Sequence, residues 1–408
     1  MAIPTPLVEV GFDLTESSIG PFFALDDSTR GVLDNTDWVL GGTIFVDITS
    51  SVRTVQIARG RGRDFSNYQA GAATVTLNNH NRYFDPLFVA SPYYGNIIPR
   101  REIRISSGGE IQFTGWIDDW DLTYTPDGDS ISTAIANDAL GLFANQNLTA
   151  SIPSVQKSGE RIAAILSDPA VSWATDLRSI DTGKATVGTQ AIEADTTALT
   201  YLQDVANSEP GDFYIDKGGL ATFRDRTKAP NSSNLVLFDE TAGIPFSNVN
   251  VIYGAELLYN EIIVGRAGGG TATASNVASQ GNYGIRSLAV TELLLNDDAD
   301  LNEYALVWAS RYSEPEYRFE SIEVQLGTIS PTFQAQMLGL ELNSIVRIKF
   351  EPNNIAPAID RYIEVISINH RITNNEHYVT LGFQGLDYQA LILDDSVFGK
   401  LDTAALSW

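Results

Sequence analysis

Apolar and polar residues alternate along much of the chain with a period of two, which is typical of half-buried β-strands. The clearest example is the stretch in which Ile103 and Ile105 alternate with charged residues. Similar runs, rich in β-branched and aromatic residues and separated by turn formers, predict strands at residues 8–12, 52–58, 73–77, 102–106, 111–124 and 130–136. From the N-terminus to about residue 145 this pattern predicts an antiparallel barrel or sandwich.

The pattern then changes to a helical spacing, which predicts helices over residues 158–167 and 195–208. The second helix begins with cap-type residues and places Leu199, Leu202 and Val205 on one face. The sequence Glu209-Pro210-Gly211-Asp212 ends this helix, and the segments 213–215 and 220–223 flank a glycine-bearing turn that predicts a hairpin. Residues 146–235 are therefore predicted to form a small mixed α+β domain.

Strands return after about residue 234. We predict them at residues 235–238, 248–252, 261–264, 286–290, 345–350, 362–372 and 378–383. Helices are predicted over residues 298–312 and from Ser330-Pro331, where a cap residue precedes a proline. The stretch 268–281, rich in Gly, Ala and Ser, is predicted to be a flexible loop.

An internal similarity suggests a duplication. Ile103-Arg104-Ile105 is followed by a long strand, a turn and a strand that ends in Asn137-Asp138-Ala139-Leu140. Val346-Arg347-Ile348 is likewise followed by a long strand, a turn and a strand that ends in Gly385-Leu386-Asp387. The predicted fold is mainly β with an α+β insertion: a barrel at 1–145, the mixed domain at 146–235, a second barrel with helices at 236–395 and a tail at 396–408.

Composition narrows the class of protein. The 408 residues are 43% hydrophobic and 10% aromatic, which is enough for more than one packed core. There is no cysteine, so disulfides and thiolate metal sites are excluded. The N-terminus does not read as a signal peptide, and no run of about eighteen apolar residues predicts a membrane span. We therefore expect a soluble protein that is made in a cytoplasm and does not insert stably into membranes.

The charge is strongly acidic, with 51 Asp and Glu against 26 Lys and Arg and a net charge of −25. A nucleic-acid reader needs the opposite balance, because cations must neutralise phosphates. The acidity fits a need for solubility, and it equally fits a surface that must not hold DNA. The one dense basic run, Arg59-Gly60-Arg61-Gly62-Arg63, is expected to dock on an acidic neighbour or to frame a turn.

Motifs for catalysis or metal binding are not apparent. The three histidines are too scattered for a metal site or a triad, and we expect them in exposed turns or at strand ends: His80, His370 and His377. Asp298, Asp300 and Asn302 imitate the start of a calcium loop but lack its Gly and terminal Glu, so a helix N-terminus is the better interpretation. We predict no catalytic, cofactor-binding or metal-binding residues, no cofactor and no enzymatic activity.

One acidic cluster allows an alternative. Asp118, Asp119 and Asp121 lie among Trp116 and Trp120, and carboxylates flanked by tryptophans suit a glycosidase cleft. On a regular strand, Asp119 and Asp121 face one way, while Asp118 shares the other face with both tryptophans. A sheet with one packed and one solvated side explains this arrangement equally well.

Ten stretches, in order along nearly the whole chain, carry a resemblance to a known family. They are Gly60-Arg61-Gly62-Arg63-Asp64-Phe65-Ser66-Asn67-Tyr68-Gln69-Ala70-Gly71, Ala73-Thr74-Val75-Thr76-Leu77-Asn78-Asn79, Arg82-Tyr83-Phe84-Asp85-Pro86, Ser91-Pro92-Tyr93-Tyr94, Pro99-Arg100-Arg101, Phe113-Thr114-Gly115, Gly211-Asp212-Phe213-Tyr214, Phe223-Arg224-Asp225-Arg226, Tyr283-Gly284-Ile285-Arg286 and Arg311-Tyr312-Ser313-Glu314-Pro315. In these stretches the chain resembles the minor tail proteins of siphophages.

This resemblance implies a baseplate hub at the tail tip of the virion, assembled in the host cytoplasm. The hub would be a homotrimer whose two tail-tube-like antiparallel barrels per chain make a ring with six similar faces. It would adjoin the distal tail protein, the tape measure or other tail-tip proteins, carry fibre or spike proteins below, and let viral DNA pass through an acidic channel. We expect residues 1–45 to attach to a neighbour and the mixed domain to hold the barrels apart.

Two other functions remain open on the sequence. The first is a host-glycan-binding tail adhesin, whose exposed aromatic platform would be Tyr93, Tyr94, Trp116 and Trp120. The second is a polysaccharide hydrolase that uses the carboxylates of residues 118–121.

Overall fold

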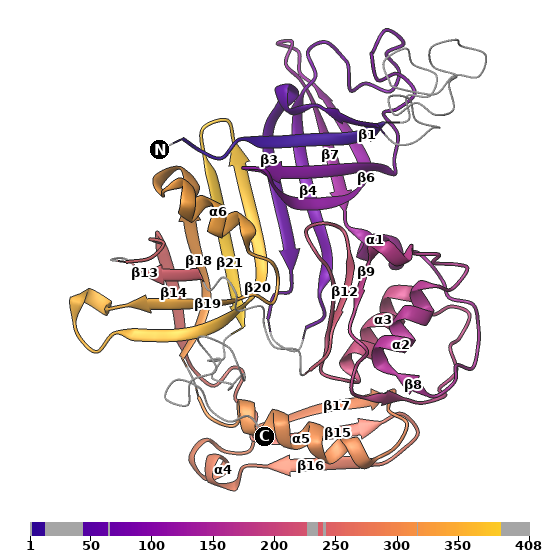
Figure 1. The fold of residues 1–408 in the computed structure, drawn as a ribbon, viewed down its shortest axis with the longest axis vertical. Helices are drawn as coiled ribbons and strands as arrows, with labels where there is room; N and C mark the ends of the chain where they lie inside the picture. Colours follow the sequence, from indigo (N-terminus) through magenta and orange to yellow (C-terminus); the bar gives the residue numbers. More distant parts are fainter. Residues whose placement is uncertain are drawn as a thin grey trace, which may run out of the picture.

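A computed structural model describes residues 2–12, 44–63, 66–226, 236–239, 242–315 and 317–384. Its largest element is a sheet of 13 strands, and strands from both the N-terminal and the C-terminal part of the described chain belong to it (Figure 1). Most of the predicted attachment segment (residues 13–43), the closing element Gly385-Leu386-Asp387 and the tail 396–408 lie outside the described residues.

The first strand set contains seven strands, in the spatial order β3-β4-β7-β6-β5-β1-β2. Their side chains alternate between buried and less buried, as in β7, because one face of each strand packs into a core. Figure 1 shows β1 running across β3 and β4, so the inner faces enclose a core that includes Val10, Val75 and Ile105. The strands are β1 (Pro6–Phe12), β2 (Ile44–Asp47), β3 (Val52–Gly60), β4 (Gln69–Asn78), β5 (Arg101–Ser107), β6 (Glu110–Tyr124) and β7 (Ser130–Asn137).

The second strand set repeats this order as β14-β18-β21-β20-β19-β13. A helix, α6 (Pro331–Gly339), connects β18 to β19, and its N-cap Ser330 accepts a hydrogen bond from the Phe333 backbone N–H, as the Ser-Pro pair predicted. The strands are β13 (Val236–Asp239), β14 (Asn248–Tyr253), β18 (Tyr317–Gln325), β19 (Ile345–Phe350), β20 (Ile359–Thr373) and β21 (His377–Gln384).

The two strand sets correspond in detail. β6 and β20 have 15 residues each, and β7 and β21 have 8. Ile103 of β5 lies opposite Gly115, and its counterpart Val346 of β19 lies opposite Ile363. Both long strands have a bulge two residues further on, immediately after Ile117 in β6 and Val365 in β20. The predicted duplication is thus confirmed in the order of the corresponding strands and in the register of these pairs. The last strands differ, because β1 pairs with β5 antiparallel whereas β13 pairs with β19 in parallel.

The expected barrels are not closed. The outer edge of β3, which a closed first barrel would need, pairs instead with β20 of the second strand set. The two sets therefore continue into one another as one open, curved sheet, and the mixed region does not hold them apart. That expectation was wrong because β3 and β20 can satisfy their backbone groups directly against each other.

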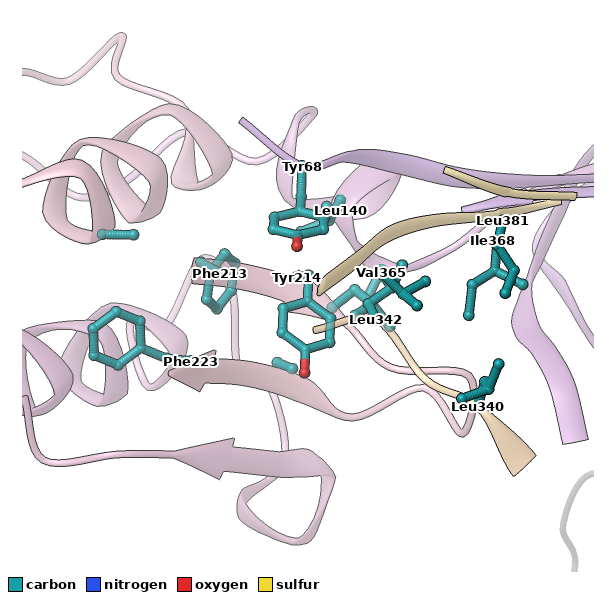
Figure 2. Close-up of a cluster of buried hydrophobic side chains, with 14 of the residues drawn as sticks. Tyr68, Leu140, Phe213, Tyr214, Phe223, Leu340, Leu342, Val365, Ile368 and Leu381 are labelled. Atoms are coloured by element: carbon teal, nitrogen blue, oxygen red, sulfur yellow. The ribbon is translucent and has the colours of Figure 1, made fainter. Parts of the chain in front are cut away.

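Between the strand sets the chain forms a mixed region with the predicted helices and hairpin. Thr197 caps α3, as predicted, by accepting a hydrogen bond from the Thr200 N–H. Figure 2 shows Phe213, Tyr214 and Phe223 of this region in one apolar cluster with Leu342 and Val365 of the second strand set. The elements are α1 (Ala139–Phe143), β8 (Gln156–Lys157), α2 (Ser158–Leu166), β9 (Arg178–Ile180), β10 (Thr186–Val187), α3 (Ala198–Asn207), β11 (Asp212–Ile215) and β12 (Ala221–Arg224).

A smaller α+β unit lies between β14 and β18. It consists of β15 (Glu261–Arg266), β16 (Thr271–Ser275), α4 (Val277–Tyr283), β17 (Ser287–Leu293) and α5 (Ala299–Tyr312). The predicted flexible loop at 268–281 was wrong, because β16 pairs with β15 and Asn276 caps α4 by accepting from the Ser279 N–H. Among the described residues, no helix is long and apolar enough to span a membrane.

Candidate functional site

The two strand sets meet at the seam, the pairing of β3 with β20 from Thr54 opposite Thr373 to Gly60 opposite Ser367. Gly60 has a φ of +118°, and a Cβ at this position would lie 2.1 Å from the carbonyl oxygen of Ile366. The Arg61 N–H donates to the same oxygen at 2.9 Å. Only glycine allows the two backbones to approach this closely.

The arginine run 59–63 continues from the seam and ties three parts of the chain to it. Arg59 Nη2 lies 2.7 Å from Glu341 Oε1, ahead of β19, and Arg61 Nη1 lies 3.0 Å from Asp212 Oδ1 at the start of β11. Arg63 makes a longer, exposed pair with Glu256, after β14. The acidic neighbours expected for this run therefore belong to the same chain.

Glu341 is the centre of the buried part of this network. Its Oε2 accepts a hydrogen bond of 2.7 Å from the Lys217 backbone N–H, in the β11–β12 turn. Arg59 also donates to the Ile215 carbonyl oxygen at 3.0 Å. The Arg59 side chain is only 4% exposed, so this charge depends on its partners rather than on water. The contacts join β3, the β11–β12 turn and the segment before β19.

His370 and His377 are buried beside the seam, contrary to the expectation of exposed positions. His370 Nδ1 lies 3.0 Å from His377 Nε2, and His377 Nδ1 lies 3.3 Å from the Ser107 hydroxyl of β5. Burial lowers the pKa of His377 to about 4 and, together with His377 and the nearby cations Arg59 and Lys217, brings the pKa of His370 well below its ordinary value. Both rings are therefore neutral at pH 7. His80 is exposed beside Asp129, as expected.

The bulge in β6 rearranges the acidic cluster. Because the extra residue lies between Ile117 and Asp119, the side-chain alternation reverses there. Trp116 consequently packs on the mixed region, at a ring distance of 5.7 Å from Trp173, whereas Trp120 stacks on Phe84 in the first core. The expectation that the two tryptophans share a face was wrong. They do not flank one cleft.

The three carboxylates also have different surroundings. Asp118 accepts a 2.7 Å hydrogen bond from the Asn137 amide and lies 3.7 Å from Arg100. Asp119 and Asp121 are exposed. Of the aromatic platform considered for glycan binding, Tyr94 is exposed, whereas Tyr93 is half-buried against Phe12 and Phe84.

The side of the sheet opposite the buried positions is lined by small polar side chains, and we call it the polar face. Charged residues on it include the acidic Asp119, Asp121 and Glu323 and the basic Arg371. Four more, Arg63, Glu256, Arg318 and Glu320, line the same hollow as Ser321, Ser367 and Asn369. Strand alternation places these residues on it: Thr54, Gln56, Thr74, Thr76, Asp119, Asp121, Thr133, Ser321, Glu323, Gln325, Ser367, Asn369, Arg371 and Thr380. Such a surface is hydrated, and of these charged residues five are acidic and three are basic.

Metal ligands are not assembled in the part of the chain that the structure describes. Asp298, which begins the calcium-like stretch, lies 2.7 Å from Arg266 Nε and accepts from the Gly270 N–H. Asp300 lies in the first turn of α5, as the helix N-terminus interpretation predicted.

Sequence reasoning did not find the acidic partners of the arginine run. Glu341, Asp212 and Glu256 lie 282, 151 and 193 residues from their arginines. No local spacing signals such distant pairs. The two glycines between the arginines gave the one available hint, because they suggest a close approach of backbone.

Comparisons with known proteins agree with this architecture. No protein-family model matches the chain, and no curated protein matches its sequence. It is similar in structure to a 43 kDa tail protein of prophage MuSo2 from Shewanella oneidensis, with a TM-score of 0.57 and 13% identity over 94% of this chain and 96% of that one. It is also similar to a tail protein from Neisseria meningitidis MC58, with a TM-score of 0.58 and 10% identity over 93% of this chain and 96% of that one. The chain therefore has the fold of these two tail proteins over almost its entire length.

Proposed function

We propose that the protein is a structural component of the tail tip of a long-tailed bacteriophage, a baseplate hub that closes the tail tube. The observation that carries this proposal is the repeated strand order of the two strand sets, joined at the seam into one sheet. A chain that presents two equivalent surfaces can adapt a sixfold tube to a threefold tip. The likeness to two tail proteins over more than nine-tenths of the chain supports the same role.

In this role three copies form a ring, and the polar face lines its channel. Viral DNA passes the hub at close quarters, and fixed cations there would bind phosphates. The polar face carries Asp119, Asp121 and Glu323 as well as Arg371, and Arg63 and Arg318 adjoin it, within a chain of net charge −25. An acidic, hydrated wall lowers the friction on the passing DNA.

The proposed neighbours follow from this position. The distal tail protein, the tape measure or other tail-tip proteins of a siphophage lie above the ring, and fibre or spike proteins lie below it. The role requires no catalysis. The different surroundings of Asp118, Asp119 and Asp121 support the proposal that they are not a hydrolytic pair.

Electron microscopy of the purified protein, with light scattering for its mass, tests the proposal. We expect a trimeric ring with a central channel, and labelled protein at the tip of the tail in the virion. A protein that remains a monomer at concentrations of about 100 μM, or that labels the capsid, would contradict it.

A further inference from the structure

Among the open strand edges of the described residues, two belong to β14 and to the second part of β6, both in the main sheet. β14 pairs with β18 on one side and with no strand on the other. The first part of β6, as far as Ile117, pairs with β5, whereas its second part, residues 119–124, pairs with β7 alone. Open strand edges are sites at which another strand can add.

These two edges are the counterparts of the two strands that meet at the seam. β14 holds the place in the second strand set that β3 holds in the first, and β6 corresponds to β20. In β20 the first part pairs with β19 and the second part pairs with β3. The same division in β6 leaves its second part without the partner that β20 has.

We propose that β14 of one copy pairs, antiparallel, with residues 119–124 of β6 in the next copy, so that the seam is repeated between chains. This rests on the proposed ring and names its interface. The pairing would continue the polar face from one copy to the next, because it joins the same strands in the same order. Each chain would then offer one β14 edge and one β6 edge, so that in a closed ring every β14 edge has a partner.

The seam also fixes the register. Gln56 of β3 lies opposite Arg371 of β20. Thr123 corresponds to Arg371, because each lies opposite the second residue of the next strand, β7 or β21. Asn250 corresponds to Gln56 for a similar reason. The β4 residue that pairs with Gln56 lies opposite the sixth residue of β7, and the β18 residue that pairs with Asn250 lies opposite the sixth residue of β21. Asn250 of one copy should therefore lie opposite Thr123 of the next.

A second contact supports a copy of this chain as the partner. Within the chain, α6, which connects β18 to β19, covers the β5–β6 turn: Gln112 Nε2 donates to the Leu338 carbonyl oxygen at 3.1 Å. The corresponding connection in the first strand set, residues 79–100, leaves Leu87 82% and Val89 71% exposed. The corresponding turn, between β19 and β20, leaves Ile355 66% exposed. The repeated seam brings these apolar side chains of two copies together, which removes both from water.

Cysteine cross-linking tests the register, because the chain contains no cysteine of its own. Residues opposite each other in antiparallel strands have Cα atoms about 4.5–5.5 Å apart, within the range of a disulfide. On oxidation, the double variant Asn250→Cys/Thr123→Cys should give covalent species up to the trimer on a non-reducing denaturing gel. The pair Ile252→Cys/Asp121→Cys, two residues along the same strands, should behave alike. Both pairs replace side chains that are not buried.

Two control variants carry cysteine pairs in the same cysteine-free protein. Gln56→Cys/Arg371→Cys spans the seam within one chain and should give an internal disulfide that leaves a monomer on the gel. Asn250→Cys/Asp119→Cys is out of register and should link far less. If light scattering shows a trimer but neither in-register pair links more than the out-of-register control, the interface is wrong and the ring survives. A monomer in light scattering would overturn both.

Discussion

At the scale of single residues, the seam depends on residues whose role is set by the atoms that surround them. Gly60 sits where a backbone oxygen of β20 leaves no room for a Cβ. His370 and His377 are held neutral in a buried chain of hydrogen bonds that ends at Ser107 of β5. Neither property follows from residue type, since glycines are usual in turns and histidines are often exposed.

Gly60→Ala should destabilise the protein by about 2–4 kcal/mol, because the substitution combines a positive φ with a clash against backbone. Gly62→Ala is the matched control, since a Cβ there meets no atom within 4 Å. It should change the stability by less than about 1 kcal/mol. Urea unfolding followed by tryptophan fluorescence measures both. Equal shifts in the midpoint would mean that the close approach at Gly60 does not matter.

The burial of His370 and His377 predicts that the stability of the folded protein depends on pH. Because the pKa of His377 in the folded protein, about 4, lies below that of the unfolded chain, about 6.5, the unfolded state binds more protons between these values. The stability contributed by the neutral His377 is therefore fully present above pH 6.5 and is lost as the pH drops toward 4. For His377 alone the loss is on the order of 3 kcal/mol at pH 4.

His377→Gln should flatten this acid-side loss in unfolding experiments between pH 7 and 4. The carboxyls of Asp138 and Glu364, whose pKa values burial raises to about 7, act in the opposite direction. They are common to both proteins and cancel in the comparison. His80→Gln, at an exposed position, should leave the profile unchanged. A profile that is identical in His377→Gln and the parent would show that the buried pair does not titrate in this range.

At the scale of elements, the sequence predicted most strands and the four longest helices because their periodicity is regular. It missed β18, a central strand, although Ile322 and Val324 alternate with polar residues. A bulge between β14 and β18 and the charged Arg318 and Glu320 interrupt that alternation. Likewise, the bulge after Ile117 misled the assignment of faces in β6. Local irregularities of this kind depend on the partner strand, which the sequence does not name.

The arginine run links these elements, and its members should differ in how much they contribute to the stability of the fold. Arg59→Met should cost about 2–3 kcal/mol, because it leaves Glu341 without its charge partner in a largely buried site. Arg63→Met, four residues on, should cost no more than about 1 kcal/mol, since both members of its pair are more than half exposed. The urea concentration at the midpoint of unfolding, measured for both variants, tests this difference. A larger effect at Arg63 would contradict the view that the network acts through its buried part.

At the scale of the whole molecule, the duplication was visible in the sequence, but the way the copies join was not. Ile103-Arg104-Ile105 and Val346-Arg347-Ile348 occupy equivalent places, as their order suggested. The pairing of β3 with β20 joins residues more than 300 positions apart, and no pattern within either strand indicates it. This pairing joins the two strand sets into one open sheet with one polar face, and the proposed channel wall rests on that continuity.

The charge of that face gives the last prediction. Assembled wild-type protein should not retain double-stranded DNA at about 150 mM salt, because a channel lined by the polar face would offer few cations to replace the counterions of the phosphates. The variant Asp119→Lys/Asp121→Lys/Glu323→Lys should bind it, with an affinity that falls steeply as salt rises, by a slope of about −0.9 for each phosphate contacted. Electrophoretic mobility and salt titration measure both proteins.

A control with the same change in net charge separates the channel from the outside of the molecule. Asp176, Glu193 and Asp195 are exposed in the mixed region and belong to none of the strands that form the polar face. Their replacement by lysine should add weak DNA binding at most, because scattered cations on a convex surface contact few phosphates at once. If this control binds DNA as tightly as the polar-face variant, only bulk charge matters. If the wild-type trimer itself binds DNA tightly at physiological salt, the polar face is not the wall of a channel for DNA.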